Sequence, residues 1–157
     1  AGAAVAATLN NLTKSEIYKC KWTNDLLVEN KKIAGILSET FSKGVIVGIG
    51  INVTMSEADL PTPSASSIYL QSQVILDRNN LLAEFCNEFK KVFEDWDRGE
   101  DLTNYYSSLS ATLKKKVKII QTGSEITGFA EKVSVNGALI LESGEEVTVG
   151  DLVHLKE

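Results

Sequence analysis

Three β segments joined by very short polar turns constrain the fold of this chain more than any other feature. They occupy residues 17–22, 26–41 and 45–53, and the second contains a turn at residues 30–31. Turns of two or three residues join antiparallel neighbours, because parallel strands need a long crossover. We therefore expect an antiparallel meander. Residues 45–53 are apolar throughout, so we expect them to form a central strand of the sheet.

A helix is expected at residues 1–12, where small residues surround Val5, Leu9 and Leu12 at helical spacing. No Ser, Thr, Asp or Asn stands ahead of the first turn, where a capping side chain is usual. A helix that opens without a cap suggests a chain cut inside or just before the helix.

A long amphipathic helix is expected after the loop at residues 54–67, which holds both prolines of the chain. Asp77 stands where an N-cap belongs, and Gly99 stands where a helix ends. Apolar residues recur between them every three or four positions: Leu81, Leu82, Phe85, Phe89, Val92, Phe93 and Trp96. We interpret this stripe as core packing rather than a cofactor box. A shorter helix is expected at residues 101–109.

From residue 116 onward the chain shows only period-two apolar patterns and turn residues, and Asn136-Gly137 is a strong hairpin signal. Five short strands in about forty residues are typical of a small SH3-like β-barrel. The predicted fold class is therefore α+β. We expect an antiparallel or mixed sheet with packed helices in residues 1–110, followed by the barrel in residues 111–157.

The composition is that of an ordinary folded protein: 157 residues, 43% of them hydrophobic and 24% charged. The sequence has no run of ~18 apolar residues and no basic leader, so we expect no membrane span and a cytoplasmic location. A net charge of −5 without a basic stripe argues against nucleic acid as a partner.

Cys20 and Cys86 lie too far apart to suggest a metal knuckle, and two thiols do not make a disulfide framework. We expect both to be buried thiols. His154 is the only histidine and falls in the last predicted strand, where a structural or surface position is favoured over catalysis.

Three short motifs carry the chemistry: Lys-Trp-Thr-Asn-Asp-Leu at 21–26, Lys-Ile-Ala-Gly-Ile-Leu at 32–37 and Gly-Ile-Gly-Ile-Asn-Val at 48–53. The last is not a dinucleotide fingerprint, because no third glycine and no helix follow it. Together the motifs resemble those of biotin protein ligases. That family carries Lys-Trp-Pro-Asn-Asp, Lys-hydrophobic-Ala-Gly-Ile-Leu and Gly-hydrophobic-Gly-hydrophobic-Asn in the same order. The resemblance extends through the predicted long helix and the C-terminal strands, so it covers essentially the whole chain.

This resemblance implies part of a catalytic domain of the class II synthetase type and an ATP-dependent biotin–protein ligase activity. Such enzymes join biotin to ATP as biotinyl-5′-AMP, with Mg²⁺, and then transfer biotin to a lysine. The lysine belongs to the biotin carboxyl carrier domain of a carboxylase. A homodimer is left open.

Lys21 is the residue expected to be catalytic. The biotin carboxylate must approach an anionic α-phosphate, and an ammonium at the end of a rigid strand can neutralise both and stabilise developing charge. Without the motif, Lys21 would be taken for a solvated strand-end lysine. The resemblance implies that Lys32 lies near the nucleotide or the carboxyl end. It also implies that Asn24 and Asp25 hold the turn that orients Lys21, with Asp25 near Mg²⁺, although Asn-Asp is ordinary turn chemistry too.

Three glycines and an asparagine complete the expected binding site. Gly35, Gly48 and Gly50 would let the biotin rings and the adenylate lie against bare backbone, which any Cβ would obstruct. A plain β-bulge is the alternative explanation for these glycines. Asn52 offers a donor and an acceptor that match the edge of adenine, and the resemblance implies that it binds there.

Two departures from the family bear on function. Thr23 stands where the family usually has proline, a change that loosens the turn or offers a hydroxyl. The family's Gly-Arg-rich loop and its ureido-binding residues are absent from this sequence. We expect a fragment whose upstream part completes the site and whose open sheet edge promotes self-association. The alternatives are a non-catalytic protein-binding module with an SH3-like barrel, and a lipoate ligase, which the motifs disfavour.

Overall fold

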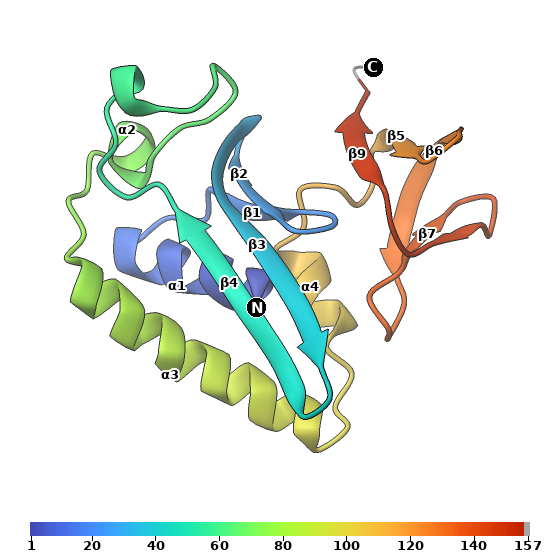
Figure 1. Cartoon of the computed structure of the whole chain (residues 1–157), viewed down its shortest axis with the longest axis horizontal. Helices are drawn as coiled ribbons and strands as arrows, with labels where there is room; N and C mark the ends of the chain where they lie inside the picture. Colours follow the sequence, from blue (N-terminus) through green and yellow to red (C-terminus); the bar gives the residue numbers. More distant parts are fainter. Residues whose placement is uncertain (156–157) are drawn as a thin grey trace.

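The computed structural model describes residues 1–155 and contains two antiparallel sheets with helices packed beside the first (Figure 1). The first sheet has the order β1-β2-β3-β4. Its strands are β1 (Tyr18–Lys21), β2 (Asp25–Val28), β3 (Lys31–Phe41) and β4 (Gly44–Ile51). The antiparallel meander predicted from the short turns is confirmed.

Two helices cover one face of this sheet. α1 (Gly2–Thr13) packs against β1 and against the long helix α3 (Arg78–Asp97); in Figure 1 α1 lies behind the sheet and α3 runs below and to the left of it. Val5 and Leu9 of α1 join Tyr18 of β1 in a core that is fully shielded from solvent. The helix expected at residues 1–12 is confirmed, and it begins without a capping side chain.

Three short helical segments flank α3. They are η1 (Glu57–Asp59), α2 (Ile68–Ser72) and α4 (Thr103–Ser108). α4 confirms the short helix expected at residues 101–109. α2 was not predicted, because five residues are too few to show a helical period; it is started by Ser67, whose hydroxyl accepts the Leu70 N–H at 3.2 Å.

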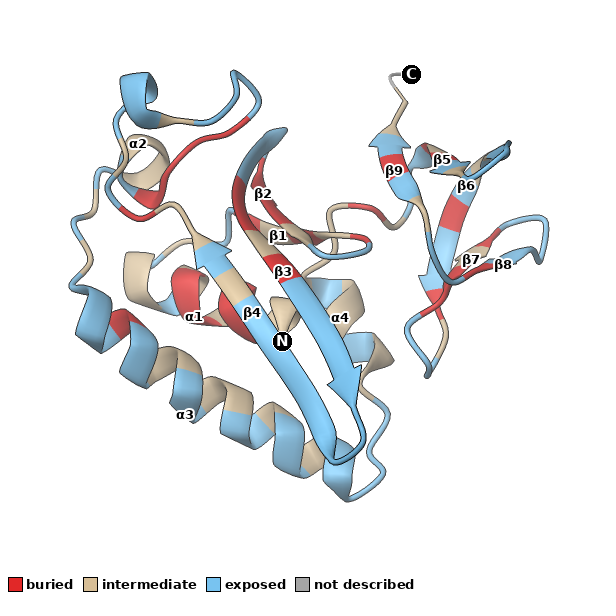
Figure 2. Ribbon diagram, in the orientation of Figure 1, coloured by how far each residue is buried: buried red, intermediate tan, exposed pale blue. Residues whose placement is uncertain are grey.

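β4 is an edge strand, so the prediction that residues 45–53 form a central strand is wrong. Within residues 1–155 it pairs only with β3. Val45 and Ile46 are 56% and 62% exposed, and the outer half of the β3–β4 hairpin is pale blue in Figure 2. An apolar run indicates a strand that can be covered on both faces, whereas its place in the sheet depends on which strands pair with it.

α3 has the predicted cap but not the predicted burial. The Asp77 carboxylate accepts the Asn80 N–H at 2.8 Å. Leu81 is buried in the core, whereas Phe93 and Trp96 are 49% and 60% exposed. The interpretation of the whole stripe as core packing is therefore wrong for Leu82, which is 61% exposed, and for the C-terminal half of the helix. There the rings contact one another along the helix, and the centroids of Phe93 and Trp96 lie 5.6 Å apart.

The two cysteines lie in different environments. Cys20 points from β1 into the core, and burial raises the pKa of its thiol to about 12. Cys86 lies on the outer side of α3 and is exposed, so the expectation that both thiols are buried is wrong for Cys86. The helical period does not show how far a neighbouring element covers each side of a helix.

The second sheet has the order β8-β7-β6-β5-β9. Its strands are β5 (Lys116–Gln121), β6 (Ser124–Val133), β7 (Leu139–Leu141), β8 (Glu146–Val147) and β9 (Asp151–His154). All five predicted strands are present. β8 and β9 end the sheet and do not pair with each other in the part of the chain that the structure describes, so no closed barrel is found there.

Candidate active site

One row of residues crosses the first sheet from strand to strand. The register sets Lys21 opposite Asp25, Asp25 opposite Gly35 and Gly35 opposite Gly50. Residues directly opposite one another in antiparallel strands share a face of the sheet. We call these four residues the Lys21 row. Motifs separated by up to two turns in the sequence thus meet on one surface.

The Lys21 row lies on the face that the helices leave open. Side chains alternate along a strand, and Ile36 and Ile49 belong to the core that α1 and α3 cover. Their neighbours Gly35, Gly48 and Gly50 therefore point to the opposite face. Leu37, which pairs with Gly48, is 64% exposed there.

The glycines differ in what lies over them. A Cβ placed on Gly50 would meet nothing within 4 Å, and one on Gly48 would meet only the Leu37 carbonyl oxygen at 3.6 Å. A Cβ on Gly35 would lie 3.2 Å from the Cε and Nζ of Lys32. The backbone is thus bare at Gly48 and Gly50, whereas the Lys32 side chain crosses Gly35.

Lys32 and Asp25 form an ion pair on this face, with Nζ and Oδ1 2.6 Å apart. The backbone of Lys32 is held by the following loop, since its N–H donates to Ser64 and its carbonyl accepts from Ser66, each at 2.8 Å. The Lys32 side chain is about half exposed, so the pair contributes about 1 kcal/mol or less to stability.

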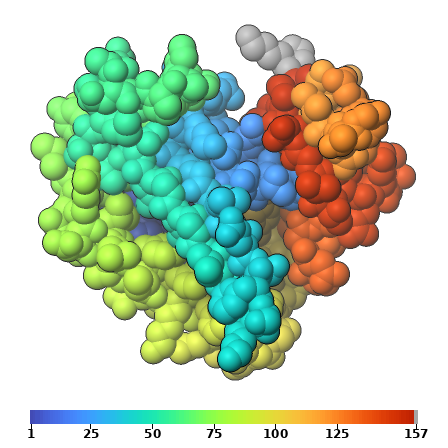
Figure 3. Space-filling model, in the orientation of Figure 1, coloured from blue at the N-terminus to red at the C-terminus, as the bar shows by residue number. Residues whose placement is uncertain are grey.

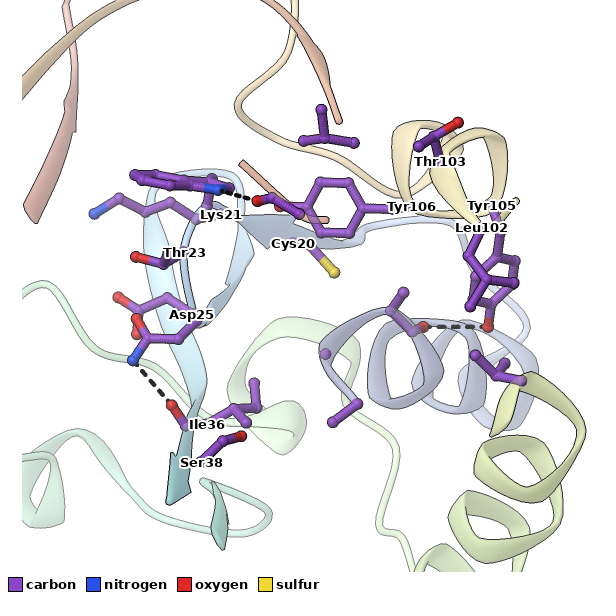
Figure 4. Close-up of a pocket in the computed structure, with 18 of the residues that line it drawn as sticks. Cys20, Lys21, Thr23, Asp25, Ile36, Ser38, Leu102, Thr103, Tyr105 and Tyr106 are labelled. Carbon is purple, nitrogen blue, oxygen red and sulfur yellow. Dashed lines mark hydrogen bonds between the residues drawn. The ribbon is translucent and has the colours of Figure 1, made fainter. Parts of the chain in front are cut away.

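Lys21 lies at the end of β1 and lines a cavity of about 540 Å³. Figure 4 shows Lys21, Thr23 and Asp25 on one side of this cavity, with Tyr105 and Leu102 on the other. No carboxylate of residues 1–155 lies within ion-pairing distance of the Lys21 ammonium. This charge is therefore available to an anionic ligand.

The side chains of Asn24 and Asn52 each donate a hydrogen bond to a backbone carbonyl of another segment. The Asn24 amide donates to the Ile36 carbonyl at 2.9 Å, which ties the turn after Lys21 to β3. The Asn52 amide donates to the Ser66 carbonyl at 2.9 Å, and the other contacts of Asn52 are made by its backbone. One amide hydrogen and the side-chain oxygen of Asn52 are left for a ligand.

The turn after Lys21 also touches the C-terminal sheet, a contact that sequence reasoning missed. Trp22 is 3% exposed and packs in the second core with Val117 and Leu139. The orange and red C-terminal residues lie directly against the blue residues in Figure 3. The Trp22–Thr23 peptide bond is cis. A large apolar side chain in a polar turn was the one available signal of this contact.

Two tyrosines of α4 close the cavity. The Tyr105 hydroxyl donates to the Glu88 carboxylate at 3.0 Å, and burial raises the pKa of Tyr105. Burial also raises the pKa of Tyr106, whose hydroxyl has no hydrogen-bond partner among the described residues. Both phenols are therefore neutral at physiological pH.

Two classes of site are not seen in residues 1–155. No three His, Cys, Asp or Glu side chains cluster there in a way that could hold a metal ion. No helix there is both long enough and apolar enough to cross a membrane.

Comparisons with known proteins agree with this geometry. Residues 2–56 match the model of the Biotin/lipoate A/B protein ligase family. The biotin–[acetyl-CoA-carboxylase] ligase of Mycobacterium tuberculosis is 30% identical over 141 residues, which are 87% of this chain and 53% of that protein. The bifunctional ligase/repressor BirA of Escherichia coli is 33% identical over 150 residues, 90% of this chain and 46% of BirA.

Solved structures show the same likeness. The biotin protein ligase of Aquifex aeolicus in complex with biotin and ATP superposes with a TM-score of 0.84 at 25% identity, covering 99% of this chain and 69% of that one. A biotin protein ligase-like protein from Silicibacter shares the fold, with a TM-score of 0.74 at 15% identity over 93% of this chain and 67% of that one.

The fold and the open sheet face make this chain an α+β protein that is similar to the biotin/lipoate ligases. Within that type, the relative from M. tuberculosis and the structural neighbour from A. aeolicus are biotin protein ligases, and the chain is similar to both. It spans about half the length of the curated relatives it matches.

Proposed function

We propose that residues 1–110 form one half of the active site of an ATP-dependent biotin–protein ligase. The enzyme would make biotinyl-5′-AMP and transfer biotin to a lysine in the biotin carboxyl carrier domain of a carboxylase. The observation that carries this proposal is the Lys21 row: it sets an ammonium with no carboxylate partner among residues 1–155 at one end, and bare backbone at Gly50 at the other. An apolar bicyclic ligand with a carboxylate tail fits such a surface.

In the first step a carboxylate oxygen of biotin attacks the α-phosphorus of ATP. A mixed anhydride forms, the bond to pyrophosphate breaks, and negative charge accumulates on the α-phosphate oxygens. Lys21 would lower the repulsion between carboxylate and phosphate and stabilise that charge, because its ammonium is fixed at a strand end. In the second step the carrier lysine amine attacks the anhydride carbonyl, AMP leaves with the bonding electron pair, and the amine loses its proton.

The remaining site residues would bind and orient the adenylate. Gly48 and Gly50 give a surface without Cβ atoms, and Gly35 is shared with the Lys32 side chain. Lys32 would approach the nucleotide by exchanging Asp25 for a phosphate. Asn52 retains an acceptor and a donor for adenine.

Mg²⁺ enters the proposal only as the ion that accompanies the phosphates of ATP. Asp25 is the one carboxylate of the Lys21 row, and its Oδ1 already pairs with Lys32. Because Mg²⁺ is usually bound through one or two carboxylates together with substrate phosphates, Asp25 would approach this ion only when ATP is present. We keep Asp25 as a residue that holds the turn after Lys21, together with Asn24.

An upstream segment would complete the site. The curated relatives are about twice as long as the matched region, and β4 presents an outer edge with no pairing strand within residues 1–155. Residues 111–157 would form an SH3-like module, and a cytoplasmic location and a homodimer are part of the same proposal. A purely protein-binding module does not explain why Lys21 shares an open sheet face with bare glycine backbone at Gly48 and Gly50.

Calorimetric titration with a non-hydrolysable biotinyl-adenylate analogue tests this function. We expect the chain to bind the analogue and Lys21→Ala to weaken binding roughly 10- to 100-fold, because a charge-assisted contact is lost. Lys19→Ala is the matched control: it removes a lysine from the same strand, and its ammonium donates to the Ser108 carbonyl at 3.3 Å. A well-folded chain that fails to bind, or one weakened equally by both changes, would contradict the proposal.

A further inference from the structure

The turn that carries Lys21 is held from outside its own sheet. The Trp22 indole N–H donates to the Gly137 carbonyl and its backbone N–H donates to the Thr112 hydroxyl, each at 3.0 Å. The Thr23 hydroxyl reaches the Gly150 carbonyl only at 3.5 Å, the limit for a hydrogen bond. Trp22 is thus the firm link between this turn and the C-terminal sheet.

The residue before Lys21 is held by the same part of the chain. The Cys20 N–H donates to the Leu109 carbonyl, and the Cys20 carbonyl accepts from the Ala111 N–H, each at 2.7 Å. The segment that joins α4 to β5 therefore runs beside β1, in a parallel bridge that pairs Cys20 with Ser110. Both chain neighbours of Lys21, Cys20 and Trp22, therefore form hydrogen bonds with this segment.

Thr112 stands at the centre of this arrangement. It is fully buried, and its hydroxyl lies 3.1 Å from Nε2 of His154 on β9. Because the hydroxyl accepts the Trp22 N–H, its single proton is free to be donated to Nε2. The pKa of His154 is lowered to about 4 by burial and by the positive charges of Lys115 and Lys21, so Nε2 can accept that proton.

We propose that Thr112, supported by His154, is a positioning residue for Lys21. Its hydroxyl fixes the Trp22 backbone and so fixes the place from which the Lys21 ammonium reaches a ligand. Neither residue lies in the three motifs, and both come from the C-terminal part of the chain. The effect on adenylate binding rests on the proposed function, whereas the positioning itself does not.

Two variants of Thr112 separate its hydroxyl from its bulk. Thr112→Val removes the hydroxyl at nearly unchanged volume, and Thr112→Ser keeps it. Amide exchange at Trp22 is followed by NMR. Acylation of Lys21 by a small reagent is followed by peptide mass spectrometry, with Lys19 as the internal reference, and the adenylate analogue is titrated in parallel.

We expect Thr112→Val to speed Trp22 exchange about tenfold or more, because its N–H loses a buried acceptor. The acylation rate of Lys21 relative to Lys19 should change about twofold or more, and the analogue should bind roughly tenfold more weakly. Thr112→Ser should stay within about twofold of the parent in all three measurements. This rescue by serine would not occur if Thr112 only filled space.

The proposal is overturned if Thr112→Val leaves Trp22 exchange and Lys21 acylation unchanged, or if Thr112→Ser behaves like Thr112→Val. If Thr112→Val does not fold, His154→Phe removes the acceptor behind Thr112 at a half-buried site. His154→Phe should change Trp22 amide exchange and Lys21 acylation in the direction expected for Thr112→Val. If it leaves both rates unchanged, the proposal is overturned. Failure of the parent to bind the analogue counts against the proposed function alone, since exchange and acylation still decide the positioning.

Discussion

His154 illustrates how little a single residue reveals before its neighbours are known. As the lone histidine in a predicted strand it was assigned a structural or surface position. In the structure its Nε2 lies 3.1 Å from the Thr112 hydroxyl, behind the turn that carries Lys21. Burial is the main cause of its low pKa, about 4 against an ordinary 6.5, and the charges of Lys115 and Lys21 add to it.

This low pKa predicts a pH dependence of stability. Between about pH 6.5 and about pH 4 the unfolded chain binds a proton at His154 that the folded chain does not. The contribution of His154 to the free energy of unfolding is therefore fully present above about pH 6.5 and is lost as the pH falls through this window. Urea unfolding across the window should show a smaller loss for His154→Gln than for the parent.

Equal losses in the two proteins would show that His154 titrates alike in the folded and unfolded states. Carboxylates with lowered pKa values, such as Asp59 and Asp101, also lose stabilisation as the pH falls, but they do so in both proteins. The comparison with His154→Gln therefore isolates the histidine.

At the scale of the element, β4 combines two surfaces with different roles. Ile49 and Ile51 face the core, and Gly48 and Gly50 face the open side of the sheet. Gly in a strand normally weakens it, because no side chain packs and the unfolded chain is more flexible. The open space above Gly50 shows that no packing within residues 1–155 requires a glycine there.

Gly50→Val should therefore fold as well as the parent or better, since a β-branched residue favours a strand. It should also abolish measurable binding of the adenylate analogue, because its side chain would occupy the ligand's place. Thermal melting and calorimetric titration check the two halves of this prediction. Ile46→Leu, on the same face of β4 but nearer the hairpin tip, serves as the control and should bind normally; normal binding by Gly50→Val would exclude the glycine surface as the site.

At the scale of the whole molecule, the outer half of the β3–β4 hairpin and much of α3 are exposed (Figure 2), and both carry large apolar side chains. Leu37, Phe41, Val45 and Ile46 are each more than half exposed. An unpaired strand edge beside such a surface favours association between copies.

The 157-residue chain should therefore self-associate, and Ile46→Lys should reduce this by placing a charge on the exposed face of the edge strand. Sedimentation velocity over a range of protein concentrations measures this self-association. Val135→Lys is the control, since Val135 is 76% exposed in a turn away from the edge, and it should leave the association unchanged. A parent chain that stays monomeric at every concentration would mean that the edge is already protected.

The sequence by itself determined the local structure and the residues of the candidate site. Short turns dictated the meander, Asp77 dictated the start of α3, and three motifs that resemble those of biotin protein ligases proposed Lys21, Gly50 and Asn52 as site residues. These features could be predicted because each depends on residues a few positions apart. Burial was predicted less well: Cys86, the outer part of α3 and the edge position of β4 all depend on which distant segment lies alongside.

Only the tertiary structure decided how the candidate site is assembled. It brought Asp25 against Lys32, set Gly35 under that pair, and joined Trp22 to Thr112 across 90 positions of sequence. No local pattern encodes such contacts, because they depend on the register of strands and on the packing of one sheet against another. The sequence motifs therefore show which residue types the candidate site contains, whereas the fold decides which residues contact them.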